Sequence, residues 1–206
     1  MSTIDQVFPT SIYRAKLGGA RAKPFLDELR IACLAIAQED GGGQHWSAQA
    51  GYKGYTSYAS LDDLPVRNPS FAELCARLEP HLLEFAQSLD WELRGHKPAV
   101  DSIWINVLEP GGTHTGHIHT NSVISGTIYI DVPDGASAIR FEDPRLAMMM
   151  AAPPRKARAG LQNRNFIYVQ PSPGTVLLWE SWLRHEVPVN MARENRISIS
   201  FNAVLA

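Results

Sequence analysis

The stretch "RISISFNAVL" near the C-terminus constrains the fold more than any other part of the 206-residue chain, because polar and apolar residues alternate along it. Successive side chains of a β-strand point to opposite faces of a sheet, so the pattern predicts a strand with one polar and one apolar face. The polar face carries Arg196, Ser198, Ser200 and Asn202. A solvent-exposed face could have this composition, but its position just after a histidine-bearing segment favours a polar pocket inside a barrel.

Three more segments after residue 98 are predicted to be strands, two of them with the same alternation. They are "VDSIWINVL", "SVISGTIYID" and the short apolar run "TVLLW", which a Pro-Gly turn precedes. In the first two, one face is apolar and carries mainly isoleucine. The opposite faces carry Val100, Ser102, Trp104, Asn106 and Leu108 in the first segment and Ser125, Thr127 and Tyr129 in the second. We expect these opposite faces to meet the polar face of the last strand.

The first 98 residues follow helical spacing instead. "KPFLDELRIACLAIAQED" and "PSFAELCARLEPHLLEFAQSLDW" repeat apolar residues every three to four positions, which indicates amphipathic helices. We expect the glycines at residues 41–43 to end the first helix. Ser70 and Glu73 have the spacing of a capping box at the start of the second. Pro80 is expected to kink or divide that helix.

Helices followed by several short strands predict an α+β fold, mainly β, with the helices packed on a β-sandwich or barrel. The length suits one domain, with helical support at residues 1–98 and a strand core at residues 99–206. An insertion at about residues 145–165 interrupts the strands with three consecutive methionines, two prolines and four arginines. This insertion is expected to be either a functional lid or an inert loop.

Composition argues against several classes of partner. The net charge is -2, from 19 basic and 21 acidic residues, so nothing favours nucleic acid or an anionic membrane. Cys33 and Cys75 lie in apolar helical patterns, as buried thiols of a reducing compartment do. No signal peptide or membrane span is recognisable, so the expected location is cytoplasmic. The amphipathic N-terminal half is compatible with a homodimer interface, so the oligomeric state is left undecided.

The candidate functional residues are the histidines of "GGTHTGHIHTNS". In an extended segment His117 and His119 point the same way, as two adjacent ligands of a metal ion do, and Ile118 is then expected to face the core. A third ligand must come from elsewhere, and His185, just after the "TVLLW" strand, is the best candidate. His114 is a weaker fourth candidate, expected outside the ligand set.

Cupins are one barrel family with related spacing. Gly111 and His117 fit the first cupin motif, but that motif continues to a glutamate where this chain has Ser122 or Val123. The second motif places a histidine soon after a Pro-Gly turn, whereas Gly174 and His185 are eleven residues apart. The cupin match therefore covers half of one motif.

The chain resembles more closely a bacterial family of iron(II)- and 2-oxoglutarate-dependent oxygenases in the prolyl-hydroxylase-like branch. The segments that carry the resemblance are "HIHTNSVISGTIYID", "FEDPR", "PSPGTVLLWESWLRHEV" and "RISISFN". The resemblance implies a double-stranded β-helix, or jelly roll, in the C-terminal half. It also implies Fe(II) as cofactor, 2-oxoglutarate as cosubstrate, and hydroxylation of a small-molecule or peptide substrate with release of succinate and carbon dioxide.

The same resemblance assigns roles to individual residues. His117 takes the first ligand position and His185 the distal one. Arg196, eleven residues after His185, takes the position of the basic residue that pairs with the far carboxylate of 2-oxoglutarate. Ser198 completes an Arg-x-Ser pattern, and Tyr129 matches a strand tyrosine that bonds the same carboxylate. A planar guanidinium fork suits a carboxylate better than lysine does.

One position departs from the family, where an aspartate or glutamate ligand is expected and His119 stands. The favoured interpretation is a three-histidine site, which leaves the metal one more positive charge and should tighten its hold on dianionic 2-oxoglutarate. Alternatively His114, Asp131 or Asp143 completes the ligand set, or the position stays open and the protein does not hydroxylate.

Two other functions remain open, a cupin-like metal enzyme that does not use 2-oxoglutarate and a binding module without catalysis. Residues 52–58 and the insertion are expected to wall a substrate site. Trp104, Asn106, Trp179 and Trp182 are candidates to line it, and core packing is an equal alternative for the tryptophans. Asn106 and Asn202 share the polar strand faces, and each is expected either to contact a ligand or, like His114, to lie just outside the ligand set.

Overall fold

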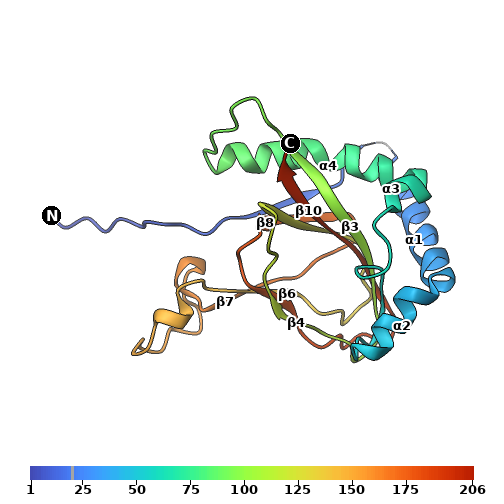
Figure 1. The fold of residues 1–206 in the computed structure, drawn as a ribbon. Helices are drawn as coiled ribbons and strands as arrows, with labels where there is room; N and C mark the ends of the chain where they lie inside the picture. The colour runs from blue at the N-terminus through green and yellow to red at the C-terminus, as the bar shows by residue number, and fades with distance from the viewer. Residues whose placement is uncertain (20) are drawn as a thin grey trace.

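The computed structural model describes residues 1–19 and 21–206, and strands from both halves of the chain form two antiparallel sheets there (Figure 1). The first sheet has the order β1 (Ile12–Lys16), β8 (Thr175–Glu180), β5 (Ile124–Asp131), β10 (Arg196–Leu205), β3 (Pro98–Leu108) and β2 (Gly54–Thr56). The second has the order β4 (His114–His117), β9 (His185–Val187), β6 (Ile139–Glu142) and β7 (Phe166–Val169). Strands β3 to β10 are thus divided four and four between the sheets, which is the predicted jelly roll.

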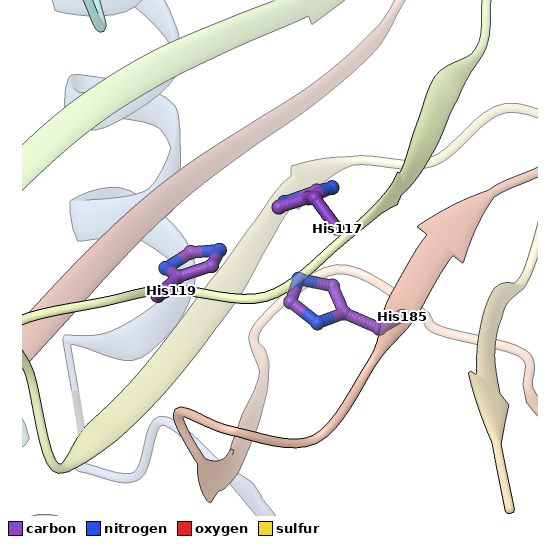
Figure 2. A group of neighbouring side chains, drawn as sticks. All are labelled: His117, His119 and His185. Atoms are coloured by element: carbon purple, nitrogen blue, oxygen red, sulfur yellow. The ribbon is translucent and has the colours of Figure 1, made fainter. Parts of the chain in front are cut away.

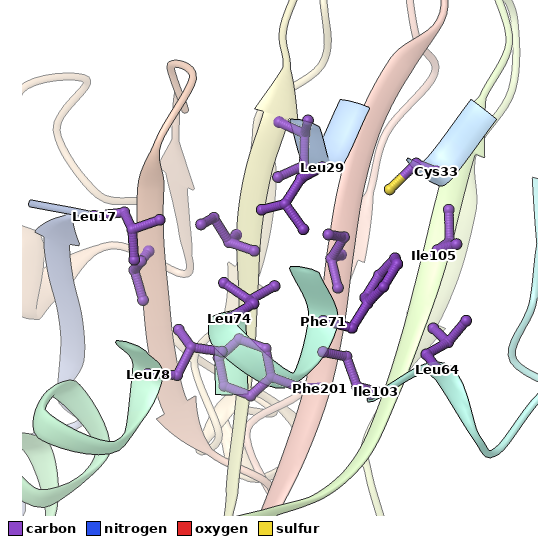
Figure 3. Close-up of a cluster of buried hydrophobic side chains, with 14 of the residues drawn as sticks. Leu17, Leu29, Cys33, Leu64, Phe71, Leu74, Leu78, Ile103, Ile105 and Phe201 are labelled. Carbon is purple, nitrogen blue, oxygen red and sulfur yellow. The ribbon is translucent and has the colours of Figure 1, made fainter. Parts of the chain in front are cut away.

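The two faces of the long strands lie on opposite sides of the sheet as predicted, except at Val100, which packs against the main core instead of sharing a face with Trp104 and Asn106. The pairing of β3 with β10 shifts beside it, between Asn202 and Ala203, which moves Val100 to the other face. Strand β10 begins at Arg196 and ends at Leu205, and it pairs with β3 on one side and β5 on the other. The apolar faces of these strands enter the main core, which includes Ile105, Ile128 and Ile199 (Figure 3). Their other faces look between the two sheets, where the polar residues meet.

The helices cover the outer, apolar face of the first sheet (Figure 1). They are α1 (Ala22–Glu39), α2 (Gly41–Gln49), α3 (Leu64–Arg67) and α4 (Pro69–Ser88). Leu29, Phe71 and Leu78 pack with the strand residues in one cluster, as Figure 3 shows. The burial of these apolar side chains is the main favourable contribution to the free energy of folding. Among the helices that the structure describes, none is long and apolar enough to cross a membrane.

Local signals in the helical half were partly wrong. Helix α1 ends at Glu39, just before the glycines at residues 41–43, as expected, but these glycines then open α2, where the Asp40 side chain accepts a hydrogen bond from the Gly43 amide. Helix α4 is capped by Asn68, which accepts from the Ser70 amide at 2.9 Å, so the expected capping box is not what begins it. Pro80 lies inside α4 without dividing it. It lies on an exposed face, where water can bond the carbonyl that a proline leaves free.

The insertion between β6 and β7 contains two short 3-10 turns, Leu146–Met148 and Leu161–Asn163, and most of its side chains are exposed. It projects from the β7 end of the second sheet, in orange in Figure 1. The N-terminal half also supplies β1 and β2 to the edges of the first sheet, so it is not purely helical. These strands are short. From β2, Thr56 donates to Asn106 on the polar face of β3, between the two sheets.

Candidate metal centre

Three histidines converge at the edge of the second sheet, and their side chains point toward one another in Figure 2. His117 ends β4, His185 begins β9, and the two are paired across the strands. His119 lies just beyond β4, where its amide donates to the Ser181 carbonyl at 3.0 Å. One ring nitrogen from each histidine lies within 4.8 Å of the others, a spacing that suits three ligands of one metal ion.

Each of the three rings is oriented by an oxygen that accepts from its Nδ1. The acceptors are the Thr115 carbonyl at 2.7 Å for His117, the Leu183 carbonyl at 2.9 Å for His185, and Asn202 Oδ1 at 2.5 Å for His119. A carbonyl or amide oxygen only accepts, so Nδ1 carries the proton in all three rings. The lone pair of each neutral ring is therefore on Nε2, as metal-binding histidines require.

The surroundings of His185 and His119 favour their neutral form. Burial, followed by the neighbouring His117, lowers the pKa of His185 from 6.5 to about 3. Burial also lowers the pKa of His119, although its hydrogen bond to Asn202 acts in the opposite direction. A neutral imidazole binds a cation without first losing a proton.

The structure separates the three histidines from the other candidate ligands. Asp131 pairs with Arg30 at 2.8 Å, and Asp143 pairs with Arg145 at 2.8 Å, so each carboxylate has a cation elsewhere. His114 does line the pocket, with its ring centroid 6.1 Å from that of His117, and burial lowers its pKa to about 3. Its ring packs at a tilt against Tyr52, with the centroids 4.7 Å apart, and lies beside the triad.

The expected orientation of Ile118 is wrong. Its side chain is 49% exposed, whereas the flanking histidines point into the pocket. The alternation of a strand is preserved between His117 and His119, but the opposite side of this segment faces solvent. The second sheet has helices on neither of its faces in Figure 1, so there is no helical layer for Ile118 to pack against.

A polar pocket between the two sheets adjoins the histidines. Its lining comes from the strand faces that the sequence singled out and from three short strands of the second sheet, β4, β6 and β9. The lining residues include Trp104, Asn106, His114, Thr127, Tyr129, Ile139, Trp179, Val187, Arg196, Ser198 and Ser200. Trp182 is 45% exposed and does not line the described pocket.

Arg196 lies in this pocket at 3% exposure. Its Nη1 donates to Ser198 Oγ at 3.5 Å, and its guanidinium carbon lies 4.8 Å from the centre of the Tyr129 ring. Within residues 1–19 and 21–206, no carboxylate lies within 4.0 Å of it, and neither Arg196 Nε nor the Tyr129 hydroxyl has a hydrogen-bond partner. A buried cation without a counter-charge is unfavourable, so this part of the pocket is suited to an anion.

Other predicted residues are held by polar neighbours. Asn106 accepts from Thr56 at 3.0 Å and donates to Ser200 at 3.1 Å. Asn202 accepts from Ser125 at 3.0 Å in addition to His119. Sequence reasoning did not single out the contacts of Thr56 and Ser125, because they depend on how distant strands pair.

Aromatic rings frame the histidines on two sides. The Trp104 ring lies 5.7 Å from His119, and Tyr58 packs edge-on against Trp104 at 5.2 Å. The Trp179 ring lies 4.6 Å from His185. The expectation that residues 52–58 approach the site agrees with the positions of Tyr52 and Tyr58, whereas the structure gives no contact of this kind for the insertion.

Several solved structures share this architecture. A prolyl-4-hydroxylase from Pseudomonas putida is 12% identical to this chain, and the two superpose with a TM-score of 0.56. The alignment covers 95% of this chain and 89% of the hydroxylase. The 2-oxoglutarate-dependent epimerase SnoN from nogalamycin biosynthesis is 12% identical with a TM-score of 0.62, covering 95% of this chain and 78% of its own. HygX from Streptomyces hygroscopicus, solved with nickel and 2-oxoglutarate, is 13% identical with a TM-score of 0.57, covering 95% and 82%. At these identities the likeness establishes the fold.

Sequence comparison identifies the family. No curated protein matches the chain. Residues 102–202 match a family model described as "Putative 2OG-Fe(II) oxygenase", and this segment spans β3 to β10 with all three histidines and Arg196. Over residues 102–202, just under half of its length, the chain is therefore similar to the 2OG-Fe(II) oxygenase family.

Proposed function

We propose that the protein is a non-haem iron(II)- and 2-oxoglutarate-dependent dioxygenase that hydroxylates a small-molecule or peptide substrate. The observation that carries the proposal is the juxtaposition of three converging imidazoles with a buried, unpaired arginine in one pocket. The histidines form a site for a cation, and Arg196 forms a site for an anion in the same pocket. Together they suit a keto acid that chelates a metal ion through its keto-acid end and carries a carboxylate at its other end.

The residues present fit iron(II). Imidazole is a good ligand for iron, and three ligands leave positions free for a bidentate keto acid and for dioxygen. We propose that His117, His119 and His185 hold the metal through Nε2, each oriented by its Nδ1 contact. When bound, the iron supplies the redox chemistry that converts 2-oxoglutarate, dioxygen and substrate into succinate, carbon dioxide and hydroxylated substrate.

The chain's own part is binding and orientation. Arg196 and Ser198 are proposed to hold the far carboxylate of 2-oxoglutarate, and the unpartnered Tyr129 hydroxyl supplies a further donor. Three neutral imidazoles leave the metal with one more positive charge than a site with a carboxylate ligand. That charge favours the dianionic keto acid and, by the same argument, other small anions.

The remaining polar residues act through these groups. Asn202 orients His119, and Asn106 is fixed on the pocket wall by Thr56 and Ser200. Trp104 and His114 are proposed to bound the space where the substrate enters, beside His119 and Tyr52 respectively. The main core joins the helices to the first sheet, which supports treating residues 1–206 as one domain. Free thiols at Cys33 and Cys75 are consistent with the proposed cytoplasmic location.

Succinate formation tests the proposal. Protein supplied with iron(II), 2-oxoglutarate and oxygen is expected to release succinate, followed by nuclear magnetic resonance, and His185→Ala is expected to release none above background. A cupin-like enzyme would bind metal without any dependence on Arg196. A binding module would form no succinate in the wild type, and that result would count against the proposed activity.

A further inference from the structure

The further inference concerns Tyr52, a residue outside the segment 102–202 that matches the family. Its phenol oxygen is buried and has no hydrogen-bond partner within the described part of the chain, residues 1–19 and 21–206. Removing a hydroxyl from water without a partner is unfavourable, so this group is expected to meet an acceptor in the working protein. The same condition holds for the Tyr129 hydroxyl and Arg196 Nε.

The sheet brings Tyr52 to the Arg196 end of the pocket. Gly54 and Arg196 both pair with Leu108, from the two opposite sides of β3. Tyr52 precedes Gly54 by two residues and lies in the segment between α2 and β2, next to the strand on which Thr56 reaches Asn106. Its ring packs at a tilt against His114, which lines the pocket, with the two ring centroids 4.7 Å apart.

The electrostatics of Tyr52 make it a hydrogen-bond donor. Burial raises the pKa of Tyr52, so the hydroxyl keeps its proton, while the positive charge of Arg196 acts in the opposite direction. Arg196 is close enough to influence Tyr52, yet a guanidinium offers no acceptor. The partner suited to Tyr52, Tyr129 and Arg196 together is an oxygen anion, and a carboxylate has lone pairs for several donors.

We propose that the Tyr52 hydroxyl donates a hydrogen bond to the far carboxylate of bound 2-oxoglutarate, beside Arg196. This inference rests on the proposed function, because it assigns one more positioning residue to the same cosubstrate. It gives the N-terminal half of the chain a part in the site through the segment between α2 and β2. Tyr52 positions the keto acid and does not contact the metal.

Tyr52→Phe tests this directly, because it removes one oxygen and keeps the ring that packs against His114. We expect the Kd for 2-oxoglutarate, measured by anaerobic calorimetry on the manganese-loaded protein, to rise about tenfold or more, as for a lost hydrogen bond to a charged group. Manganese affinity should stay unchanged. The melting temperature of the ligand-free protein should not fall, because the lost hydroxyl has no partner there.

Tyr55→Phe is the matched control on the neighbouring strand β2. The Tyr55 hydroxyl donates to Asp40 at 2.8 Å, and its side chain lies in the core. This variant should lower the melting temperature and leave the Kd for 2-oxoglutarate unchanged, which is the reverse of the Tyr52→Phe pattern.

The outcomes separate this inference from the proposed function. If the wild type binds 2-oxoglutarate and Tyr52→Phe binds it with the same Kd, the role of Tyr52 is overturned and the proposed function stands. If the wild type does not bind 2-oxoglutarate, both are overturned. A lower melting temperature of ligand-free Tyr52→Phe with unchanged Kd would show a structural role instead.

Discussion

The side-chain oxygen of Asn202 lies 2.5 Å from Nδ1 of His119, and this contact joins the last strand of the first sheet to the metal-binding edge of the second. Asn202 also accepts from Ser125 and donates to Ser102 at 3.3 Å, so its amide has one preferred orientation. His119 stands where the sequence resemblance to these oxygenases leads us to expect a carboxylate ligand. Its orientation therefore depends on a residue 83 positions further along the chain.

Asn202→Ala should weaken metal binding without removing any proposed ligand. His119 loses the acceptor that holds its proton on Nδ1, and loss of such a contact typically lowers metal affinity about 10- to 100-fold. Competition against a coloured chelator measures the affinity. Ser102→Ala, which removes only the outer contact of Asn202, is the control and should change the affinity little. Equal metal affinity in Asn202→Ala and the wild type would contradict this role.

His119→Asp should retain a metal site but weaken the binding of 2-oxoglutarate. A carboxylate ligand removes one net positive charge from the centre, which lowers its attraction for a dianion by about tenfold at an intermediate effective dielectric constant. Calorimetry with the manganese-loaded protein measures the Kd, and His119→Ala separates loss of a ligand from change of charge. Tighter binding of 2-oxoglutarate by His119→Asp would show that the neutral ligand set does not favour the anion.

Arg196→Met should reduce 2-oxoglutarate affinity by about a hundredfold or more, as expected for a lost charge-assisted pair. The ligand-free protein should be no less stable, because an unpaired buried charge is replaced by an apolar chain. Calorimetry and thermal unfolding give the two values. Arg140→Met is the control, since Arg140 pairs with Glu186 at 2.8 Å on the second sheet, away from the pocket lining. An unchanged affinity in Arg196→Met would remove the proposed anion site.

The metal-free protein should lose stability as the pH falls from about 6.5 toward 3. His185 takes up a proton near 6.5 when unfolded but only near 3 when folded, so the unfolded chain binds more protons between these values. Each such group contributes a slope of up to about 1.4 kcal/mol per pH unit in this window. Urea unfolding at pH 7.5 and 5.5 measures the loss, which should be smaller in His185→Gln. Equal losses in the two proteins would contradict the assignment to His185.

The long strands could be predicted from sequence, because polar and apolar residues that alternate over ten positions fit a half-buried strand and do not fit the period of a helix. Strand β10 begins and ends where the pattern of "RISISFNAVL" does, and the faces of β3 and β5 are as expected apart from Val100, which a shift in strand pairing places on the core side. The prediction depends on one face being buried by helices and the other by a polar pocket. Both conditions hold for the first sheet.

The second sheet was harder to predict, because its strands are three or four residues long. Strand β4 contains a glycine, and its pairing with β9 shifts between His114 and His117, so no regular alternation is visible. Nothing in the sequence indicates that this sheet has an exposed outer face, and the prediction for Ile118 was wrong for that reason. The contacts of Asn202 and Tyr52 likewise depend on strand pairing between distant segments, which local patterns do not encode.

The most direct test of the proposed iron(II) and 2-oxoglutarate site is an anaerobic spectrum of the protein with both added. A keto acid chelated to iron(II) held by the three histidines should give a weak visible charge-transfer band. We predict the band in the wild type, its loss in His185→Ala, and a much higher 2-oxoglutarate requirement in Arg196→Ala. A wild-type protein that shows no band and no binding of 2-oxoglutarate by calorimetry would contradict the account.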